Sequence, residues 1–140
     1  MLQHGITIAL CRQSFGSDLS AGLDFYVGIL GFIVIEDCKI TARTRWLVIA
    51  PSALSDTKII LAKASTEAQI RAIGLQTGDR VGFFLHSDAF ATDYHTMRAA
   101  EVVFEETPRQ EPYGWVAVWR YPFRNHWDLL QRRQPSSQGA

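Results

Sequence analysis

The feature that most constrains the fold of this 140-residue chain is a repeat, because the same order of predicted elements occurs twice. Apolar runs in the first half predict strands at residues 6–11, 32–37, 45–50 and 58–63, with a helix between the first two. The order then returns, with strands predicted at 80–86, 102–105, 115–121 and 126–131 and a helix after the first. Asp18 and Asp88 each stand where a helix is predicted to begin, about 70 residues apart. A β-α-β-β-β order that occurs twice predicts two similar modules.

The predicted helices and breaks divide the chain. Apolar residues at helical spacing give each helix one buried face: Leu19, Leu23, Tyr26 and Leu30 in the first, and Phe90, Tyr94 and Met97 in the second. Gly31 follows the first helix, where a left-handed cap suits a residue without a Cβ. The predicted parts are a βαβββ module (1–64), a linker with a short helix (65–78), a second βαβββ module (79–133) and a loose tail (134–140). Residues 108–112 are predicted to form a polar turn within the second module.

Composition excludes several classes of protein. The chain is 47% hydrophobic and balances 14 Lys and Arg against 14 Asp and Glu, so it is neither a disordered chain nor a strongly basic nucleic-acid binder. Cys11 and Cys38 are too few for a disulfide framework and are interpreted as free thiols. The chain has no apolar run near the ~20 residues that cross a bilayer, and its first residues do not resemble a signal peptide. These features predict a cytoplasmic protein that binds neither membrane nor nucleic acid.

Three groups of short motifs accompany the repeat. They are LDFY and LGF at residues 23–26 and 30–32, RWLV before Pro51 at residues 45–48, and PYGW, YPFRN and LLQ at 112–115, 121–125 and 129–131. In this order, the motifs and the two modules resemble the vicinal oxygen chelate superfamily, in its uncharacterised glyoxalase-like branch. That superfamily includes glyoxalase I, bleomycin-resistance proteins and extradiol dioxygenases. Tyr121 and Arg124 stand where the family's turn usually has aspartate and glycine, and Glu101 replaces a customary glycine after the second helix.

The resemblance implies an α+β fold in which two βαβββ modules form curved mixed sheets around a cavity. It also implies that a homodimer, or the two modules of one chain, completes that cavity. Metal-dependent members hold a divalent ion with His and carboxylate side chains on the first and last strands of the modules.

The resemblance places only part of such a ligand set on this chain. Asp128 matches the carboxylate of the last strand, whereas Val81 and Ile60 fall where other ligands are expected. His4 and His86 are the remaining weak candidates, and two protein ligands make a poor catalytic site. We therefore expect no standard metal centre and no other cofactor. His95 is expected to be exposed on the second helix.

Asp128 leaves two alternatives open. A carboxylate among Trp127, Leu129 and Leu130 must either line a pocket or form an ion pair, for which Arg45 or Arg120 would be the partner. As a pocket residue it is also the best candidate for a catalytic group.

Aromatic and basic residues complete the predicted ligand site. Strand alternation puts Trp115 and Trp119 on one face and Arg120 on the other, while His126 shares a face with Asp128. Indole rings on a curved sheet suit a flat apolar ligand, although core packing is the more common role of such rings. Arg120 and Arg124 are candidates for capturing an anionic group. The predicted ligand-binding residues are Trp46, Trp115, Trp119, Arg120, His126 and Asp128.

The leading functional hypothesis is a superfamily member without the standard metal site that binds a small apolar or aromatic molecule in a dimer cavity. The zero net charge weighs against the acidic cleft that the family uses for cationic bleomycin. The alternative is a metal-dependent lyase, isomerase or dioxygenase with a non-standard site. A third possibility is a small ferredoxin-like interaction protein that has no pocket.

Overall fold

The computed structural model describes residues 5–10, 19–42, 44–78, 80–122 and 124–133, with the backbone alone for the first of these ranges. Two compact units make up the chain, Met1–Ile73 and Gly74–Ala140. Their boundary lies within the predicted linker. Within the described residues, no helix is both long enough and apolar enough to cross a membrane.

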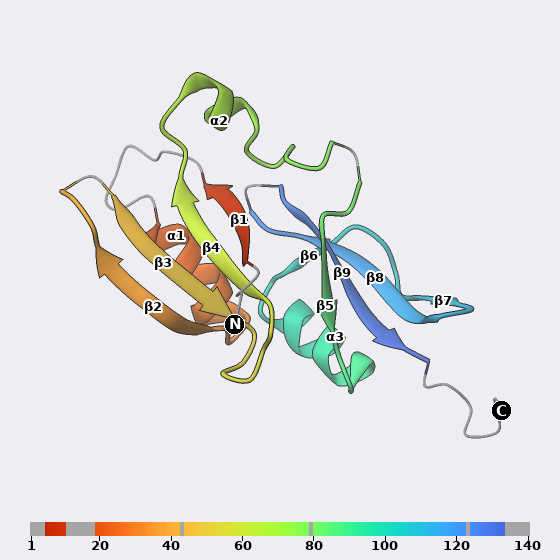
Figure 1. The fold of residues 1–140 in the computed structure, drawn as a ribbon. Helices are drawn as coiled ribbons and strands as arrows, with labels where there is room; N and C mark the ends of the chain where they lie inside the picture. Colours follow the sequence, from red (N-terminus) through yellow and green to blue (C-terminus); the bar gives the residue numbers. More distant parts are fainter. Residues whose placement is uncertain (1–4, 11–18, 43, 79, 123, 134–140) are drawn as a thin grey trace, which may run out of the picture. The chain divides into compact units, whose positions relative to one another are not determined.

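The first unit is a four-stranded sheet with helices (Figure 1). In chain order its elements are β1 (Gly5–Leu10), α1 (Ser20–Leu23), the π-helix η1 (Asp24–Ile29), β2 (Ile33–Lys39), β3 (Arg45–Ala50), β4 (Lys58–Lys63) and α2 (Glu67–Arg71). The sheet order is β1-β4-β3-β2, in which β1 and β4 run parallel and the other neighbours run antiparallel. The fully buried side chains of Leu47, Ile49 and Leu61 place the core of this unit against β3 and β4.

The first predicted helix differs from a regular amphipathic helix. The Leu30 amide donates to the Phe25 carbonyl at 3.0 Å, five residues back, which is the spacing of a π-helix. The wider turn buries the adjacent rings of Phe25 and Tyr26 together, whereas the regular spacing predicted only Tyr26. Gly31 has a φ of +78°, so the predicted left-handed cap is confirmed.

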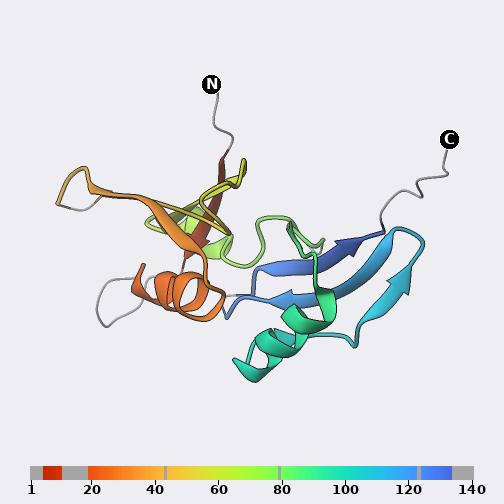
Figure 2. The ribbon, with the colours of Figure 1, turned by 90° about the horizontal axis from the view of Figure 1, so that it is seen from below.

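The second unit repeats the topology of the first. Its elements are β5 (Phe83–His86), α3 (Phe90–Ala99), β6 (Val103–Phe104), β7 (Arg109–Glu111), β8 (Gly114–Arg120) and β9 (His126–Arg132). The sheet order is β5-β9-β8-β6, and β5 runs parallel to β9 as β1 does to β4. The predicted repeat is therefore confirmed as two sheets with the same strand order. Figure 2 shows α3 along one face of this sheet.

Predictions at two places in the second unit are wrong, around the start of α3 and at the predicted polar turn. Helix α3 begins at Phe90, and Ser87 prepares its start: the Ser87 Oγ accepts the Ala89 amide at 3.0 Å and donates to Asp93. Asp88 therefore precedes the helix, and β5 begins at Phe83 rather than at residue 80. Residues 109–111 are not a turn but strand β7, which pairs with the first half of β8.

A break between β6 and β7 explains the second error. Residues 105–108 interrupt the strand that pairs with β8, and Pro108 has no amide hydrogen for a ladder. The Glu106 carboxylate takes the place of a backbone acceptor, receiving the Val118 amide at 3.1 Å. The polar residues that predicted a turn therefore belong to an interrupted strand.

Candidate functional site

Strand register sorts the side chains of the second sheet onto two faces. One row across the sheet is Phe83, Trp127, Trp119 and Phe104, each a Cα partner of the next. Helix α3 covers this face: the Phe90 and Trp115 rings lie 6.3 Å apart, and the Tyr94 and Phe104 rings 4.7 Å apart. The neighbouring row, which points to the opposite face, is Phe84, Asp128 and Val118. We call this opposite surface, centred on Asp128, the Asp128 face.

The two predicted tryptophans of the second unit lie on the face of the sheet opposite to Asp128. Trp119 is fully buried under α3 and stacks on Trp127, with ring centroids 5.1 Å apart. Trp115 shares that side of the sheet and is 42% exposed. Trp46 belongs to the first unit, where its indole nitrogen donates to Glu36. Trp115 and Trp119 therefore lie across the sheet from the Asp128 carboxyl group.

Asp128 itself is buried in an unusual way for a carboxylate. It is 8% exposed, and its buried Oδ1 accepts no hydrogen bond from any residue that the structure describes. Desolvation raises the pKa of the Asp128 carboxyl above its ordinary 3.8, while the nearby charge of Arg109 opposes the shift and that of Glu106 adds to it. Such an acceptor is costly to bury, and no described residue uses its hydrogen-bonding capacity.

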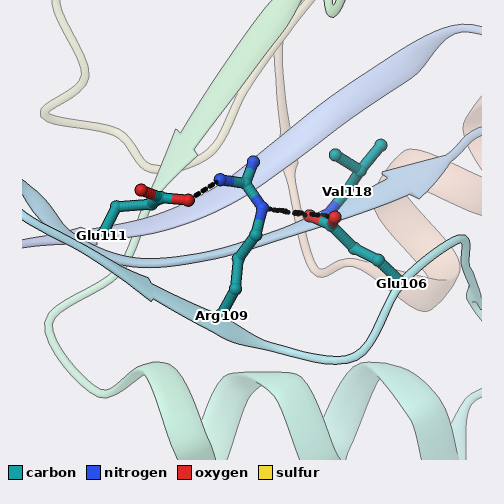
Figure 3. Close-up of polar contacts among 4 residues, drawn as sticks. All are labelled: Glu106, Arg109, Glu111 and Val118. Atoms are coloured by element: carbon teal, nitrogen blue, oxygen red, sulfur yellow. Dashed lines mark hydrogen bonds and ion pairs between the residues drawn. The ribbon is translucent and has the colours of Figure 1, made fainter.

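The positive charge that acts on the Asp128 carboxyl group is that of Arg109. The Arg109 guanidinium, however, is bound by two other carboxylates (Figure 3). The Arg109 Nε donates to Glu106 at 3.1 Å and its Nη1 donates to Glu111. These bonds, Glu111 first, raise the pKa of the guanidinium. Because Glu106 also holds the Val118 amide, the cluster is fixed to the backbone of β8 next to Asp128.

The two arginines considered as ion-pair partners of Asp128 are bound elsewhere, so that expectation is wrong. Arg45 makes a two-bonded pair with Asp37, at 2.8 and 2.7 Å. This pairing lowers the pKa of Asp37. Arg120 lies 3.9 Å from Glu105, which also contacts His126 at 3.1 Å. Both predicted ligand residues, Arg120 and His126, thus meet at one end of the Asp128 face through Glu105.

The described side chains fit a metal ion poorly. The strand neighbour of Asp128 is Phe84, and Val81, where the resemblance places a histidine ligand, lies before β5. His86 lies two residues farther along β5, beside Leu130, and is exposed. No three His, Cys, Asp or Glu side chains of the described residues come together as a possible metal site.

Other candidates lie outside this cluster. His4 falls outside the described residues. His95 is exposed on α3 beside Tyr94, as expected, and Arg124 is exposed in the turn before β9.

The repeat gives Asp128 a counterpart in the first unit. Ile60 has Thr7 and Val48 as its Cα partners, just as Asp128 has Phe84 and Val118. The strand pairing therefore shows that Ile60 occupies in the first unit the position that Asp128 occupies in the second. Only the second unit places a carboxyl group at this position.

Sequence reasoning missed three residues around Asp128. Phe84 was assigned to a strand without a role, and Glu106 and Arg109 were assigned to connections. The strand register that brings them together joins residues 12 to 44 positions apart, as in the pairs Glu106–Val118 and Phe84–Asp128. The alternating charges at residues 106, 109 and 111 were the one available signal of an ion-pair cluster.

Comparison with known proteins identifies the family. The model of the Glyoxalase/Bleomycin resistance protein/Dioxygenase superfamily matches residues 9–129. An uncharacterized protein of Shewanella frigidimarina (strain NCIMB 400) is 39% identical over 116 residues, which cover 82% of this chain and 86% of that protein.

Two solved structures have a similar fold. The crystal structure of UcmS2 is 26% identical, with a TM-score of 0.74 and coverage of 90% of this chain and 94% of that one. TnmS3, an antibiotic binding protein from Streptomyces sp. CB03234, is 24% identical, with a TM-score of 0.70 and coverage of 94% and 98%. Sequence match and strand topology agree, and the chain belongs to the Glyoxalase/Bleomycin resistance protein/Dioxygenase superfamily.

Proposed function

We propose that this protein binds a small apolar or aromatic molecule on the Asp128 face, without a metal ion or other cofactor. The observation that carries the proposal is the strand pairing of Asp128 with Phe84. This pairing puts an aromatic side chain, 56% exposed, directly beside Asp128 in the sheet. An exposed ring beside apolar strand residues favours contact with an apolar molecule.

A similar protein supports a binding role. TnmS3 is described as an antibiotic binding protein, and its fold is that of this chain. The likeness supports binding of a small molecule as the general role. We infer the apolar character of the ligand from Phe84, Val118 and Leu130, which surround Asp128 in the register.

A thermal-shift screen of small aromatic and apolar compounds in the presence of a chelator tests the proposal. A ligand that binds only the folded state raises the melting temperature by mass action. We expect hits in chelator and a loss of the shift when Phe84 is replaced by Asp, with His95→Asp as an exposed control. A screen in which compounds bind only after a divalent metal is added would contradict the proposal.

The second candidate function is a metal-dependent lyase, isomerase or dioxygenase, favoured by the unpartnered Oδ1 of Asp128 at the family's carboxylate position. After reconstitution with Zn²⁺, Ni²⁺, Mn²⁺ or Fe²⁺, metal analysis would find a bound ion that Asp128→Ala loses. Absence of a bound ion after all four reconstitutions would reject this candidate.

We also propose that the protein is a homodimer. Val34 on β2, the edge strand of the first sheet, is 43% exposed, so an apolar side chain is available at this edge for a second copy. Sedimentation at micromolar concentration should give twice the chain mass of 15.8 kDa, whereas a monomer would refute the dimer.

A further inference from the structure

We propose that Asp128 selects ligands in which an N–H or O–H donor lies next to an aromatic ring, with the donor on the Asp128 carboxyl and the ring on Phe84. This inference rests on the proposed binding function and names the chemistry of its ligand.

The carboxyl group of Asp128 supplies the hydrogen-bond acceptor of the proposed site. Asp128 is more than nine-tenths buried, yet its Oδ1 receives no hydrogen bond from the described part of the chain. A buried acceptor without a donor destabilises the fold, and a donor supplied by a ligand removes that penalty on binding. The same site would reject an analogue without the donor, because the acceptor would then stay unsatisfied.

The neighbours of Asp128 set the position of the ring. Phe84 lies beside it on β5 and Val118 beside it on β8, both on the same face. Leu130 follows Asp128 two residues later on the same face and is 8% exposed. A donor that reaches Oδ1 therefore carries its attached group onto apolar side chains, and Phe84 offers a ring for aromatic packing.

Arg109 is the described residue whose positive charge acts on Asp128, and Glu106 and Glu111 bind it instead. The two carboxylates act as positioning residues, because they hold the guanidinium in other hydrogen bonds. Two negative charges against one positive charge also leave a local negative excess beside Asp128. The site therefore accepts a neutral or positively charged donor and disfavours an anionic ligand.

Four probes of similar size separate these features. Benzyl alcohol and benzylamine carry a donor next to a phenyl ring, toluene lacks the donor, and benzoate carries a negative charge in its place. Titrations followed by protein NMR should show both donors binding at least about tenfold more tightly than toluene and benzoate, the factor that corresponds to a charge-assisted hydrogen bond. The shifted resonances should include those of Phe84 and Val118.

Variants test whether Asp128 is responsible. Asp128→Leu should reduce the affinity for benzyl alcohol to that for toluene, while Asp128→Asn, which keeps an acceptor oxygen, should retain part of the preference. The double variant Glu106→Gln and Glu111→Gln should weaken the preference by releasing Arg109 toward Asp128. Asp56→Asn, at an exposed carboxylate of the first unit, is the matched control and should leave it unchanged.

The outcomes distinguish the two claims. If toluene and benzyl alcohol bind equally well, or if the preference survives in Asp128→Leu, donor selection is overturned while the binding function stands. If none of the four probes binds the Asp128 face, both the proposed function and this inference are contradicted. Asp128→Asn keeps the test decisive should Asp128→Leu fail to fold.

Discussion

A single carboxyl group distinguishes the second sheet from the first. Asp128 replaces the apolar side chain that Ile60 supplies at the equivalent position, and it brings a buried oxygen that no described residue satisfies. Burying such a group costs about 1–3 kcal/mol on the scale of protein mutations. A residue that weakens the fold at the proposed binding site is consistent with a role in binding rather than in stability.

Replacement of Asp128 by leucine should therefore stabilise the protein. We expect Asp128→Leu to raise the free energy of unfolding by about 1–3 kcal/mol, because an apolar side chain removes the desolvation cost. Urea denaturation followed by circular dichroism measures the change. Asp56→Leu, at an exposed site, should stay within about 0.5 kcal/mol of the wild type. A lower stability of Asp128→Leu would show that the carboxyl group is satisfied in the folded protein.

The raised pKa of Asp128 makes this cost dependent on pH. The folded protein holds the proton to a higher pH than the unfolded chain, in which the pKa is near 3.8. The cost is therefore complete above the folded pKa and disappears as the pH falls to 3.8. The free energy of unfolding of the wild type, relative to Asp128→Asn, should rise as the pH falls from 7 to about 3.8.

Asp37 provides a control of opposite sign for this pH series. Its pKa is lowered by the hydrogen bonds with Arg45, so its contribution stabilises the fold above 3.8 and is lost as the pH falls through the lowered value. Relative to Asp37→Asn, the wild type should therefore lose stability on acidification. For each variant, the difference in free energy of unfolding from the wild type is plotted against pH. The same slope for Asp128→Asn and Asp37→Asn would contradict the opposite pKa shifts of the two carboxyl groups.

At the level of elements, turns and strand breaks determine the local backbone geometry. Glu101 and Arg124 stand where the family usually has glycine, and both adopt left-handed backbone conformations, with φ of +67° and +74°. Both positions thus adopt a conformation that glycine favours, although each carries a side chain. Left-handed residues with a Cβ cost about 1–2 kcal/mol, so these two positions carry backbone strain.

Arg124 offers a direct test of that strain, because its side chain is exposed. Arg124→Gly should raise the free energy of unfolding by about 0.5–1 kcal/mol. Glycine relieves the strain of the left-handed backbone, and the greater conformational entropy of glycine in the unfolded chain offsets part of this gain. Arg124→Val should lower it by about 1–2 kcal/mol, because a β-branched side chain suits this region poorly. Thermal or urea unfolding measures both, and a destabilised Arg124→Gly would contradict the account of the turn.

The elements also show where sequence reasoning ends. Strands β3 and β4 were predicted with their observed bounds, because each is an apolar run between clear breaks. The π-helix and the β6–β7 break were not predicted. Both depend on hydrogen bonds that leave the regular pattern, from Leu30 to Phe25 and from Val118 to Glu106.

At the scale of the whole molecule, the repeat predicted the fold, and the register between distant strands determined the site. The repeat is visible along the chain, since each module carries its own strands and helix. The environment of Asp128 is not visible there, because Phe84 lies 44 residues away in sequence and adjacent in the sheet. Strand alternation correctly predicted that Trp115 and Trp119 share one face of the sheet. It did not show that α3 covers this face, because the helix comes from a distant part of the sequence.

Duplicated topology with different side chains suits a binding role. The two sheets share their strand order, but their equivalent positions hold Ile60 and Asp128. The second unit alone combines a buried acceptor, an exposed ring and a bound arginine among the described residues of its sheet. Metal-independent binding on this face is therefore the central claim.

A calorimetric titration of benzyl alcohol into the chelator-treated protein tests that claim most directly, with repeats after loading with Zn²⁺, Ni²⁺, Mn²⁺ or Fe²⁺. We expect binding in chelator, the same dissociation constant after each loading, and weaker binding in Asp128→Leu. Binding that appears only with a metal, together with loss of that metal in Asp128→Ala, would contradict that claim.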